Sequence, residues 1–174
     1  ANEQLTDSDL DVLITYGEVD AKNVLSRQLF SRINTPACSP HFLERYGPFD
    51  TPSQIASAPL LHDETTAGWQ EWCRLAGIPE AKVTSGTIYQ DFNLLVTAVI
   101  AGHGIGLCPV NVFREEIGRG DLVVISSVSI YDDKGYAIVT RRDRSKVVAD
   151  FVEWFFELTR ENRKPLPGQE NLGH

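Results

Sequence analysis

Apolar positions recur with a helical period in the middle of the chain, where residues 92–100 place one apolar face at i, i+3, i+4, i+7 and i+8. These positions are Phe92, Leu95, Val96, Val99 and Ile100. Asp91 precedes them as an N-cap, although Thr87-x-x-Gln90 is an alternative capping box. Gly102 and Gly104 then end the helix, because glycine accepts the positive φ angles of a tight turn. The pattern predicts a helix that turns directly into a short apolar strand over residues 105–108.

The same alternation of strands and helices extends along the rest of the chain. Short apolar runs predict strands over residues 10–15, 60–62, 83–87, 122–125 and 136–140, and residues 29–38 form an extended stretch. N-cap residues predict helices after Ser39 and Thr51, over residues 66–76, after Asn111, and from Ser145 to Leu158. Alternating elements of this kind favour an α/β fold with mostly parallel sheets covered on both faces.

Composition narrows the classes of partner. The 174 residues carry a formal net charge of -8, and an acidic chain repels phosphate backbones, so we expect this polypeptide by itself not to bind nucleic acid. No apolar run has the length of a bilayer, which predicts no membrane partner. The three cysteines, Cys38, Cys73 and Cys108, lie in apolar or helical stretches and predict buried, reduced thiols in a cytoplasmic protein.

Motifs for catalysis or cofactor binding do not emerge from the sequence. Gly102-x-Gly104-x-Gly106 follows a helix and opens a strand, whereas a dinucleotide loop follows a strand and opens a helix. The four histidines are scattered without metal-ligand spacing, and His62-Asp63-Glu64 is either a small cation site or, more simply, a solvated loop. We therefore predict no enzyme, no cofactor, no metal site and no catalytic residue.

Seven stretches, in this order, resemble the effector-binding domain of LysR-type transcriptional regulators. They are LDVLITYG (10–17), PACSPHFLERYGP (36–48), TPSQIASAPLLHDE (51–64), WQEWCRLAGI (69–78), YQDFNLLVTAVIAGHGIGLCP (89–109), GRGDLVVI (118–125) and YAIVTRRD…VVADFVEWF (136–155). The combination of LLHDE with a downstream WQEW is most similar to the subgroup that contains the glycine-cleavage and β-lactamase activators.

This resemblance implies two α/β lobes like those of type II periplasmic binding proteins, with a small effector in the cleft between them. It assigns residues 1–35 and 141–160 to an incomplete first lobe and residues 36–140 to a second lobe; residues 161–174 are polar and predict a mobile tail. The winged helix-turn-helix of the family is missing from this sequence, as are the first strand, first helix and second strand of the first lobe. We therefore expect an N-terminally truncated chain that reaches DNA only through the missing domain.

The function that the resemblance implies is effector sensing in a bacterial transcriptional regulator, as a homodimer or a higher homo-oligomer. A solute-binding protein of a transport system shares the lobed architecture and is the alternative. Exposed apolar surface on an incomplete lobe also predicts self-association.

Candidate effector-binding residues lie where strands run into loops, because ligands of open α/β sheets bind beyond the carboxyl ends of strands. We expect one edge to be formed by Thr15, Tyr16, Gly17 and Glu18, a second by Gln90, Asp91 and Phe92, and the site to be closed by Ser39 and Tyr136. Two simpler roles stay open, because Asp91 can merely cap its helix and Tyr136 can merely pack within its strand. A capping carboxylate at Asp91 repels an anionic effector, which favours a ligand with an amine or neutral polar groups, such as an amino acid or a peptide-like compound.

Overall fold

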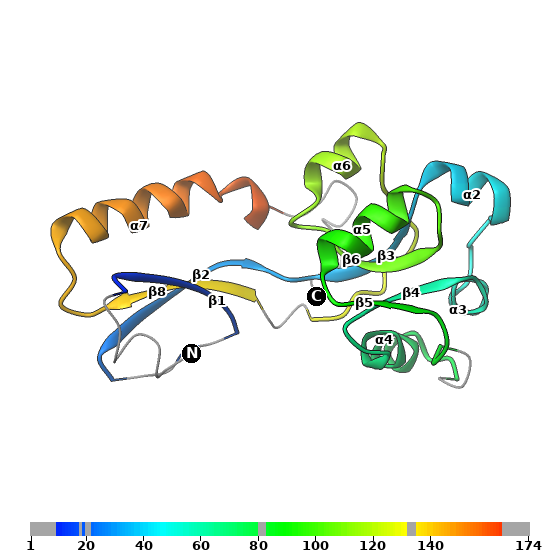
Figure 1. Cartoon of the computed structure of the whole chain (residues 1–174), viewed down its shortest axis with the longest axis horizontal. Coiled ribbons are helices and arrows are strands. Elements are labelled where there is room, and N and C mark those ends of the chain that lie inside the picture. The colour runs from blue at the N-terminus through cyan, green and yellow to red at the C-terminus, as the bar shows by residue number, and fades with distance from the viewer. Residues whose placement is uncertain (1–9, 18, 20–21, 80–82, 132–134, 165–174) are drawn as a thin grey trace. The chain divides into compact units, whose positions relative to one another are not determined.

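The computed structural model describes residues 10–17, 19, 22–79, 83–131 and 135–164. The chain divides into two compact units: unit 1 combines Ala1–Arg32 with Tyr131–His174, and unit 2 is Ile33–Ile130 (Figure 1). Each unit has its own sheet and its own buried apolar residues.

Unit 1 is built on a three-stranded antiparallel sheet with the order β1-β8-β2. Its strands are β1 (Val12–Tyr16), β2 (Val24–Ser31) and β8 (Gly135–Arg141). The central strand therefore comes from the opposite end of the sequence to both of its neighbours. Helix α7 (Lys146–Leu158) begins at the N-cap Ser145 and buries Val152 against residues of β2 and β8. A 3-10 turn, η2 (Glu161–Arg163), follows it.

Unit 2 is built on a five-stranded mixed sheet with the order β5-β4-β6-β3-β7. Strand β4 is parallel to both of its neighbours, whereas β3 is antiparallel to both β6 and β7. The strands are β3 (Asn34–Cys38), β4 (Leu60–Asp63), β5 (Thr87–Tyr89), β6 (Ile105–Pro109) and β7 (Val123–Val124). The helices are α2 (Pro40–Tyr46), α3 (Pro52–Ser57), α4 (Ala67–Ala76), α5 (Phe92–Ile100) and α6 (Arg114–Arg119).

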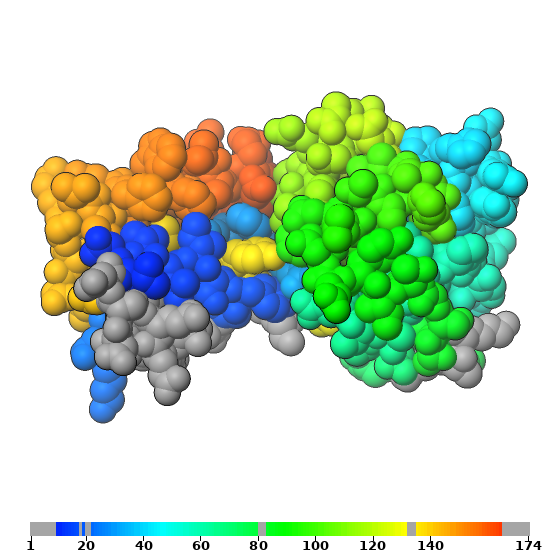
Figure 2. All heavy atoms as spheres, in the orientation of Figure 1, coloured from blue at the N-terminus to red at the C-terminus, as the bar shows by residue number. Residues whose placement is uncertain are grey.

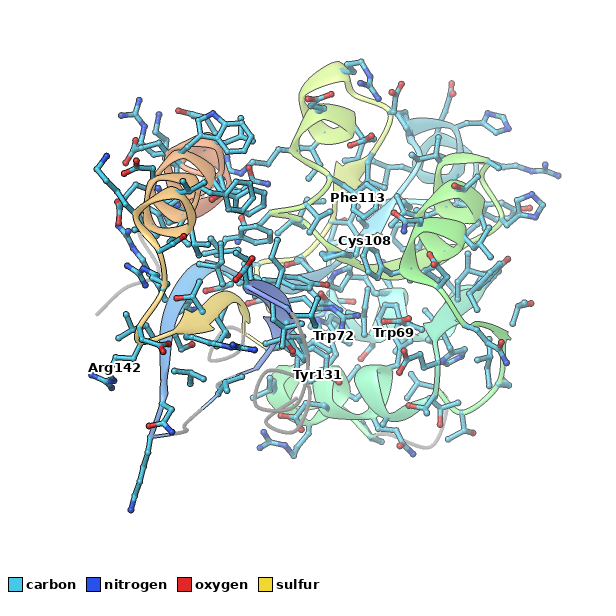
Figure 3. All side chains as sticks on the ribbon, turned by 60° about the vertical axis from the view of Figure 1, so that its left-hand side comes forward. Trp69, Trp72, Cys108, Phe113, Tyr131 and Arg142 are labelled. Carbon is cyan, nitrogen blue, oxygen red and sulfur yellow. The ribbon has the colours of Figure 1, made fainter. Side chains whose placement is uncertain are left out.

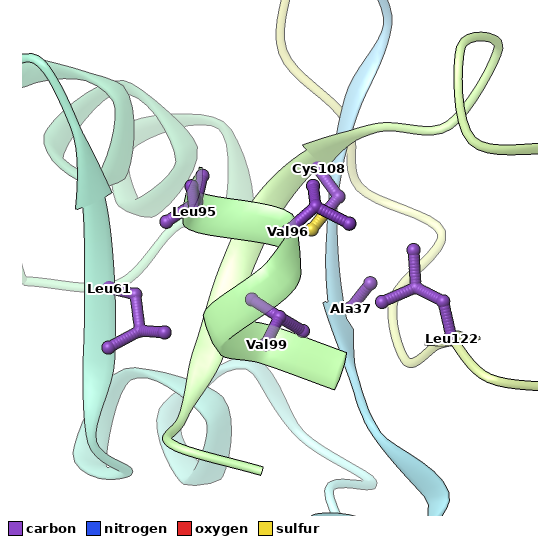
Figure 4. Packing of buried hydrophobic residues seen from close by; sticks show 7 residues of the cluster. All are labelled: Ala37, Leu61, Leu95, Val96, Val99, Cys108 and Leu122. Atoms are coloured by element: carbon purple, nitrogen blue, oxygen red, sulfur yellow. The ribbon is translucent and has the colours of Figure 1, made fainter. Parts of the chain in front are cut away.

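Helix α5 and strand β6 form the centre of unit 2, which confirms the helix and strand predicted from the apolar period. Three residues of α5 are buried, and they pack with Ala37 of β3, Leu61 of β4 and Cys108 of β6 (Figure 4). The turn between the two elements needs Gly102, which adopts a left-handed φ of 83°. A Cβ atom at Gly106 would lie 2.7 Å from the Cγ2 atom of Val99, so glycine allows the helix to pack closely over the strand.

Helix α4 contributes two buried tryptophans, Trp69 and Trp72, to the core of unit 2 (Figure 3). The rings of Trp69 and Trp72 are edge-to-face, with centroids 5.4 Å apart, and both side chains are buried. Each indole N–H donates a hydrogen bond to a backbone carbonyl: that of Trp69 to Leu61 at 2.9 Å and that of Trp72 to Val128 at 3.0 Å. The pair is therefore satisfied within the core and is not available to stack against a ligand.

Three expectations about organisation need correction. Residues 136–140 were assigned to the second lobe, but β8 lies between β1 and β2 in unit 1, and the units divide at residues 32/33 and 130/131. The sheets are mixed rather than mostly parallel, because parallel pairing among the described strands is confined to β4 with β5 and β6. The start of the expected mobile tail is ordered, since the Arg163 guanidinium donates a 2.7 Å hydrogen bond to the carbonyl of Phe156. Residues 165–174 lie outside the described residues.

None of the helices in the described ranges is long and apolar enough to cross a membrane.

Candidate functional site

The candidate edge in unit 2, formed by residues 90–92, lies at the carboxyl ends of two parallel strands. Strand β5 runs parallel to β4 with Tyr89 beside Asp63, so Gln90 and Asp91 follow directly at the same end of the sheet. The backbone N–H of Glu64 donates a 2.7 Å hydrogen bond to the carbonyl of Tyr89, which ties the two loops together. The edge therefore combines adjacent strand ends with the first turn of α5, the arrangement in which ligands of α/β sheets commonly bind.

Asp91 has the capping role that its position predicts. One carboxylate oxygen accepts hydrogen bonds from the backbone N–H groups of Asn93 at 2.6 Å and Leu94 at 3.4 Å. The Asp91 side chain and that of Gln90 are exposed, whereas Phe92 is half-buried and its ring makes an edge-on contact with Phe113, with centroids 6.1 Å apart. The negative charge at this edge therefore already interacts with the amides of the helix terminus.

The second candidate edge belongs to unit 1 and is built around paired aromatic rings. Tyr16 of β1 lies opposite Tyr136 of β8, with ring centroids 5.6 Å apart. On the other side, Tyr136 lies 5.4 Å from the ring of Phe30 in β2. The Arg32 guanidinium carbon lies 5.1 Å from the centroid of the Tyr16 ring. Tyr136 is thus held between two rings at one end of the three strands.

The turn after β1 completes this edge. Gly17 has a left-handed φ of 90°, and its N–H donates a 2.9 Å hydrogen bond to the carbonyl of Gly135, so Gly17 closes the ladder between β1 and β8. Thr15 precedes it and pairs with Ala137. The structure therefore brings together four of the predicted residues, namely Thr15, Tyr16, Gly17 and Tyr136. Glu18 lies outside the described residues.

Ser39 does not belong to either edge, which corrects the expectation that it closes the site. Strand β3 runs antiparallel to β6, so Ala37 lies beside Gly106 and Ser39 lies near the start of β6. Asp91 lies at the other end of this sheet, since β4 and β5 run in the same direction as β6. The Ser39 hydroxyl accepts the N–H of Phe42 at 3.2 Å and caps α2. The sequence predicted that Ser39, followed by a proline, caps a helix. It did not predict where Ser39 lies relative to the sheet, because that position depends on the order and direction of the strands.

Two buried polar residues at the Asp91 end of unit 2 were missed by the sequence reasoning. Asn34 and Thr35 begin β3, and Thr35 pairs with Cys108 near the end of β6. Both side chains are buried, and the Asn34 Oδ1 and Thr35 Oγ1 atoms have no hydrogen-bond partner among the described residues. The sequence carried no signal for these two residues, because the strand NTPAC does not alternate between polar and apolar residues.

A cavity of about 470 Å³ lies in unit 2 at the other end of the sheet. Its polar lining includes Ser57, Ser85, Thr87 and His103, and it contains none of the residues predicted to bind an effector. Within the described ranges, no three His, Cys, Asp or Glu side chains come together in a way that could hold a metal ion.

The cysteines are buried thiols outside any disulfide, as predicted. Burial raises the pKa of Cys38 to about 11 and raises the pKa of Cys108 still further. Both thiols therefore stay protonated near neutral pH, which disfavours a nucleophilic role.

The comparison with known families identifies this architecture. The model of the LysR substrate binding domain matches residues 1–160, and the chain belongs to this family.

Curated relatives agree with the subgroup suggested by LLHDE and WQEW. The chain is 28% identical over 148 residues to the glycine cleavage system transcriptional activator of Escherichia coli K12, covering 84% of this chain and 48% of that protein. It is 28% identical over 152 residues, with the same coverage, to the carbapenem-hydrolyzing beta-lactamase transcriptional activator of Enterobacter cloacae. The chain thus spans about half the length of the curated relatives that it matches. These relatives are regulators and do not favour the transport-protein alternative.

Solved structures support the fold. The effector domain of AmpR from Pseudomonas aeruginosa matches with a TM-score of 0.71 at 19% identity, over 86% of this chain and 72% of that one. The regulatory domain of CrgA from Neisseria meningitidis matches with a TM-score of 0.69 at 21% identity, over 89% and 78%. The α/β fold of the type II periplasmic-binding-protein class is therefore confirmed.

Proposed function

We propose that this chain is the effector-sensing domain of a bacterial LysR-type transcriptional regulator, which binds a small polar metabolite and passes the signal to a homo-oligomer. Family membership carries this proposal, and it is supported by the grouping of Thr15, Tyr16, Gly17 and Tyr136 in unit 1 and of residues 90–92 in unit 2. The net charge of -8 makes direct contact of this chain with a DNA backbone unfavourable. DNA recognition then belongs to another part of the protein.

In unit 2, we infer that Gln90, Asp91 and Phe92 bind the effector. The Asp91 carboxylate is exposed and already holds two amides of the helix terminus. An anionic group would meet this negative charge, whereas an amine or a neutral hydrogen-bond donor would be attracted. The unpartnered oxygens of Asn34 and Thr35 at the same end of the sheet favour a donor-rich ligand as well.

For unit 1, we infer that Thr15, Tyr16, Gly17 and Tyr136 form an edge that can bind an effector by itself. The paired tyrosine rings offer an aromatic surface with hydroxyl groups, and this combination suits an amino acid or a peptide-like compound. A ligand with different affinities for two conformational states of the protein would shift the populations of those states.

A thermal-shift screen of free amino acids and short peptides tests this proposal. A compound at a hundred times its Kd stabilises the chain by about 2.7 kcal/mol, which the screen detects readily. Asp91→Asn retains a capping residue but removes the charge, so we expect it to lower affinity without loss of stability. Asp50→Asn, in the exposed loop before α3, is the matched control. Unchanged binding by both Asp91→Asn and Tyr136→Ala would remove the proposed site.

A further inference from the structure

The cavity in unit 2 lies at the amino ends of two parallel strands and has the size of a small-molecule site. Its volume is about 470 Å³. One wall is formed by residues 56–61, which join α3 to β4. The other wall is formed by residues 85–87, at the start of β5, and by His103 in the turn before β6. In Figure 2, the blue-green atoms of the α3–β4 stretch border the green atoms of the segment from β5 to β6.

Both walls are held against the start of β4 by the fold itself. Gly86 has a positive φ of 146°, and a Cβ atom there would lie 2.7 Å from the Nε2 atom of His62. A Cβ atom at Gly104 would lie 2.6 Å from the carbonyl oxygen of Pro59. The buried His62 side chain adds another tie, because its Nε2 atom donates a 3.0 Å hydrogen bond to the Ser85 carbonyl. The cavity is therefore preformed, and a ligand does not have to order its walls.

The lining combines uncharged polar groups with apolar ones. Ser57, Ser85 and Thr87 contribute hydroxyl groups, and His103 contributes an imidazole ring. Each hydroxyl can donate one hydrogen bond and accept others. The Ser57 hydroxyl donates to the carbonyl of Ser53 at 2.8 Å, which leaves its oxygen as an acceptor. The other lining residues are alanines, a proline, leucines and a glycine, so the lining suits a ligand that carries hydroxyl groups on a carbon frame.

The charge of the surroundings favours an uncharged ligand. Among the described residues that line the cavity, none is Asp, Glu, Lys or Arg, so a charged ligand would lose hydration without gaining an opposite charge. An anion is disfavoured further, because residues 33–130 contain ten Asp and Glu but only five Lys and Arg. The negative end of α5 also lies beside His103, whose backbone N–H donates to the Ala98 carbonyl at 3.1 Å.

We propose that this cavity is a second ligand site, which binds an uncharged compound with several hydroxyl groups, of the size of a small polyol or a monosaccharide. The hydroxyl groups of the ligand bond to Ser85, Thr87 and His103, while its C–H groups pack against the wall that contains Pro59. The effector edge of unit 2 differs in place and in chemistry, because it lies at the carboxyl ends of the same strands and carries the charge of Asp91. The second site therefore does not depend on the proposed function.

Amide chemical shifts of the isotope-labelled full chain, titrated with sorbitol, myo-inositol and D-glucose, test the site. We expect at least one of these probes to cause saturable shifts at Ser57, at residues 85–87 and at His103. A Kd of about 1 mM is expected, because a ligand of this size makes few contacts. Ethanolamine and acetate carry opposite charges and should bind there at least about tenfold more weakly.

Two results of these titrations would overturn the proposal. One is the absence of saturable shifts at the cavity with all three uncharged probes at concentrations up to about 50 mM, well above the expected Kd. The other is binding of ethanolamine or acetate at the cavity that is as tight as that of the uncharged probes.

Single hydroxyl deletions test the contacts of the probe that binds. Thr87→Val keeps the branched shape of the side chain, and we expect it to weaken binding about two- to tenfold, as does Ser85→Ala, because each removes one hydrogen bond. Thr84→Val is the matched control, since Thr84 is an exposed residue next to the cavity but outside its lining. Thermal melting shows whether each variant is folded. If both cavity variants bind as tightly as Thr84→Val, or if the shifts appear at residues 90–92 instead, the proposal is wrong.

Discussion

Unit 2 and unit 1 differ in how they are assembled from the sequence. Unit 2 is one continuous stretch in which helices follow the strands of its sheet along the sequence. Its central residues are fully enclosed, with Leu95 and Val99 of α5 packed over β6. Unit 1 joins two distant stretches of sequence, and it leaves Leu10, just before β1, and Ile14, within β1, exposed. Most of the buried apolar residues therefore belong to unit 2, whereas unit 1 has only a few of them.

This difference indicates which unit resists opening and which unit changes more readily on binding. Enclosed cores resist opening, while regions with few buried apolar contacts open at lower free energy and are used for binding. Long-range strand pairing, such as that of β8 with β1, also costs more chain entropy than local pairing. We therefore expect unit 2 to hold the fold and unit 1 to adapt to effector and partner.

The largest effect should come from truncating the enclosed core of unit 2. Leu95→Ala and Ile105→Ala should each lower the free energy of unfolding by about 2–4 kcal/mol, because both side chains are fully buried. Leu94→Ala is the matched control, because the Leu94 side chain, next to Leu95 in α5, is 60% exposed. Chemical denaturation measures all three variants. A loss in Leu95→Ala no greater than in Leu94→Ala would mean that α5 is not the core of its unit.

The same contrast explains what the sequence could predict. Unit 2 was readable because its signals are local: an apolar period ends at Gly102, and capping residues such as Asp91 and Thr51 mark where helices begin. The prediction placed β8 in the wrong lobe, because the residues YAIVT carry no local signal that they pair with β1 and β2. Only the pairing of distant strands decides that.

The candidate site shows the same division. Gln90, Asp91 and Phe92 were predicted from a helix start, and Tyr16 and Tyr136 come together as expected. The contribution of Phe30 to the aromatic edge could not be predicted, because it depends on a register shift in β2. Ser39 was misplaced for a related reason, since the direction of β3 puts it at the far end of the sheet.

Alkaline pH should weaken unit 2 through its buried thiols. The pKa values of Cys38 and Cys108 are raised in the folded state, so the unfolded thiols ionise first as the pH passes their ordinary value of 9.0. Their contribution to stability is complete below that pH and falls as the pH rises, until about 11 for Cys38. Each thiol should cost about 1.4 kcal/mol per pH unit within its window.

Denaturation at several alkaline pH values measures this loss, with a Cys38→Ala/Cys108→Ala chain as the control for other titrating groups. The stability of the wild-type chain should fall more steeply with pH than that of the control. Equal slopes would show that the thiols do not titrate differently in the two states.

The smallest effects should come from the helix caps, one in each unit. Asp91→Ala and Ser145→Ala each remove a side chain that accepts backbone N–H groups at a helix start, which costs about 1 kcal/mol. Hydrogen exchange should show lower protection in unit 2 for the first variant and in unit 1 for the second. Asp91→Asn retains the cap and should resemble the wild type. Loss of protection in both units from either change would contradict the independence of the two cores.

The central claim is that a small effector is sensed at the two strand-end edges. The most direct test is a titration of the isotope-labelled chain with the strongest stabilising amino acid or peptide from the thermal-shift screen, followed by amide chemical shifts. We predict that the shifts concentrate at Gln90–Phe92 in unit 2 and at residues 15–17 and Tyr136 in unit 1. Shifts confined to the cavity lined by Ser85 and His103 would contradict the claim.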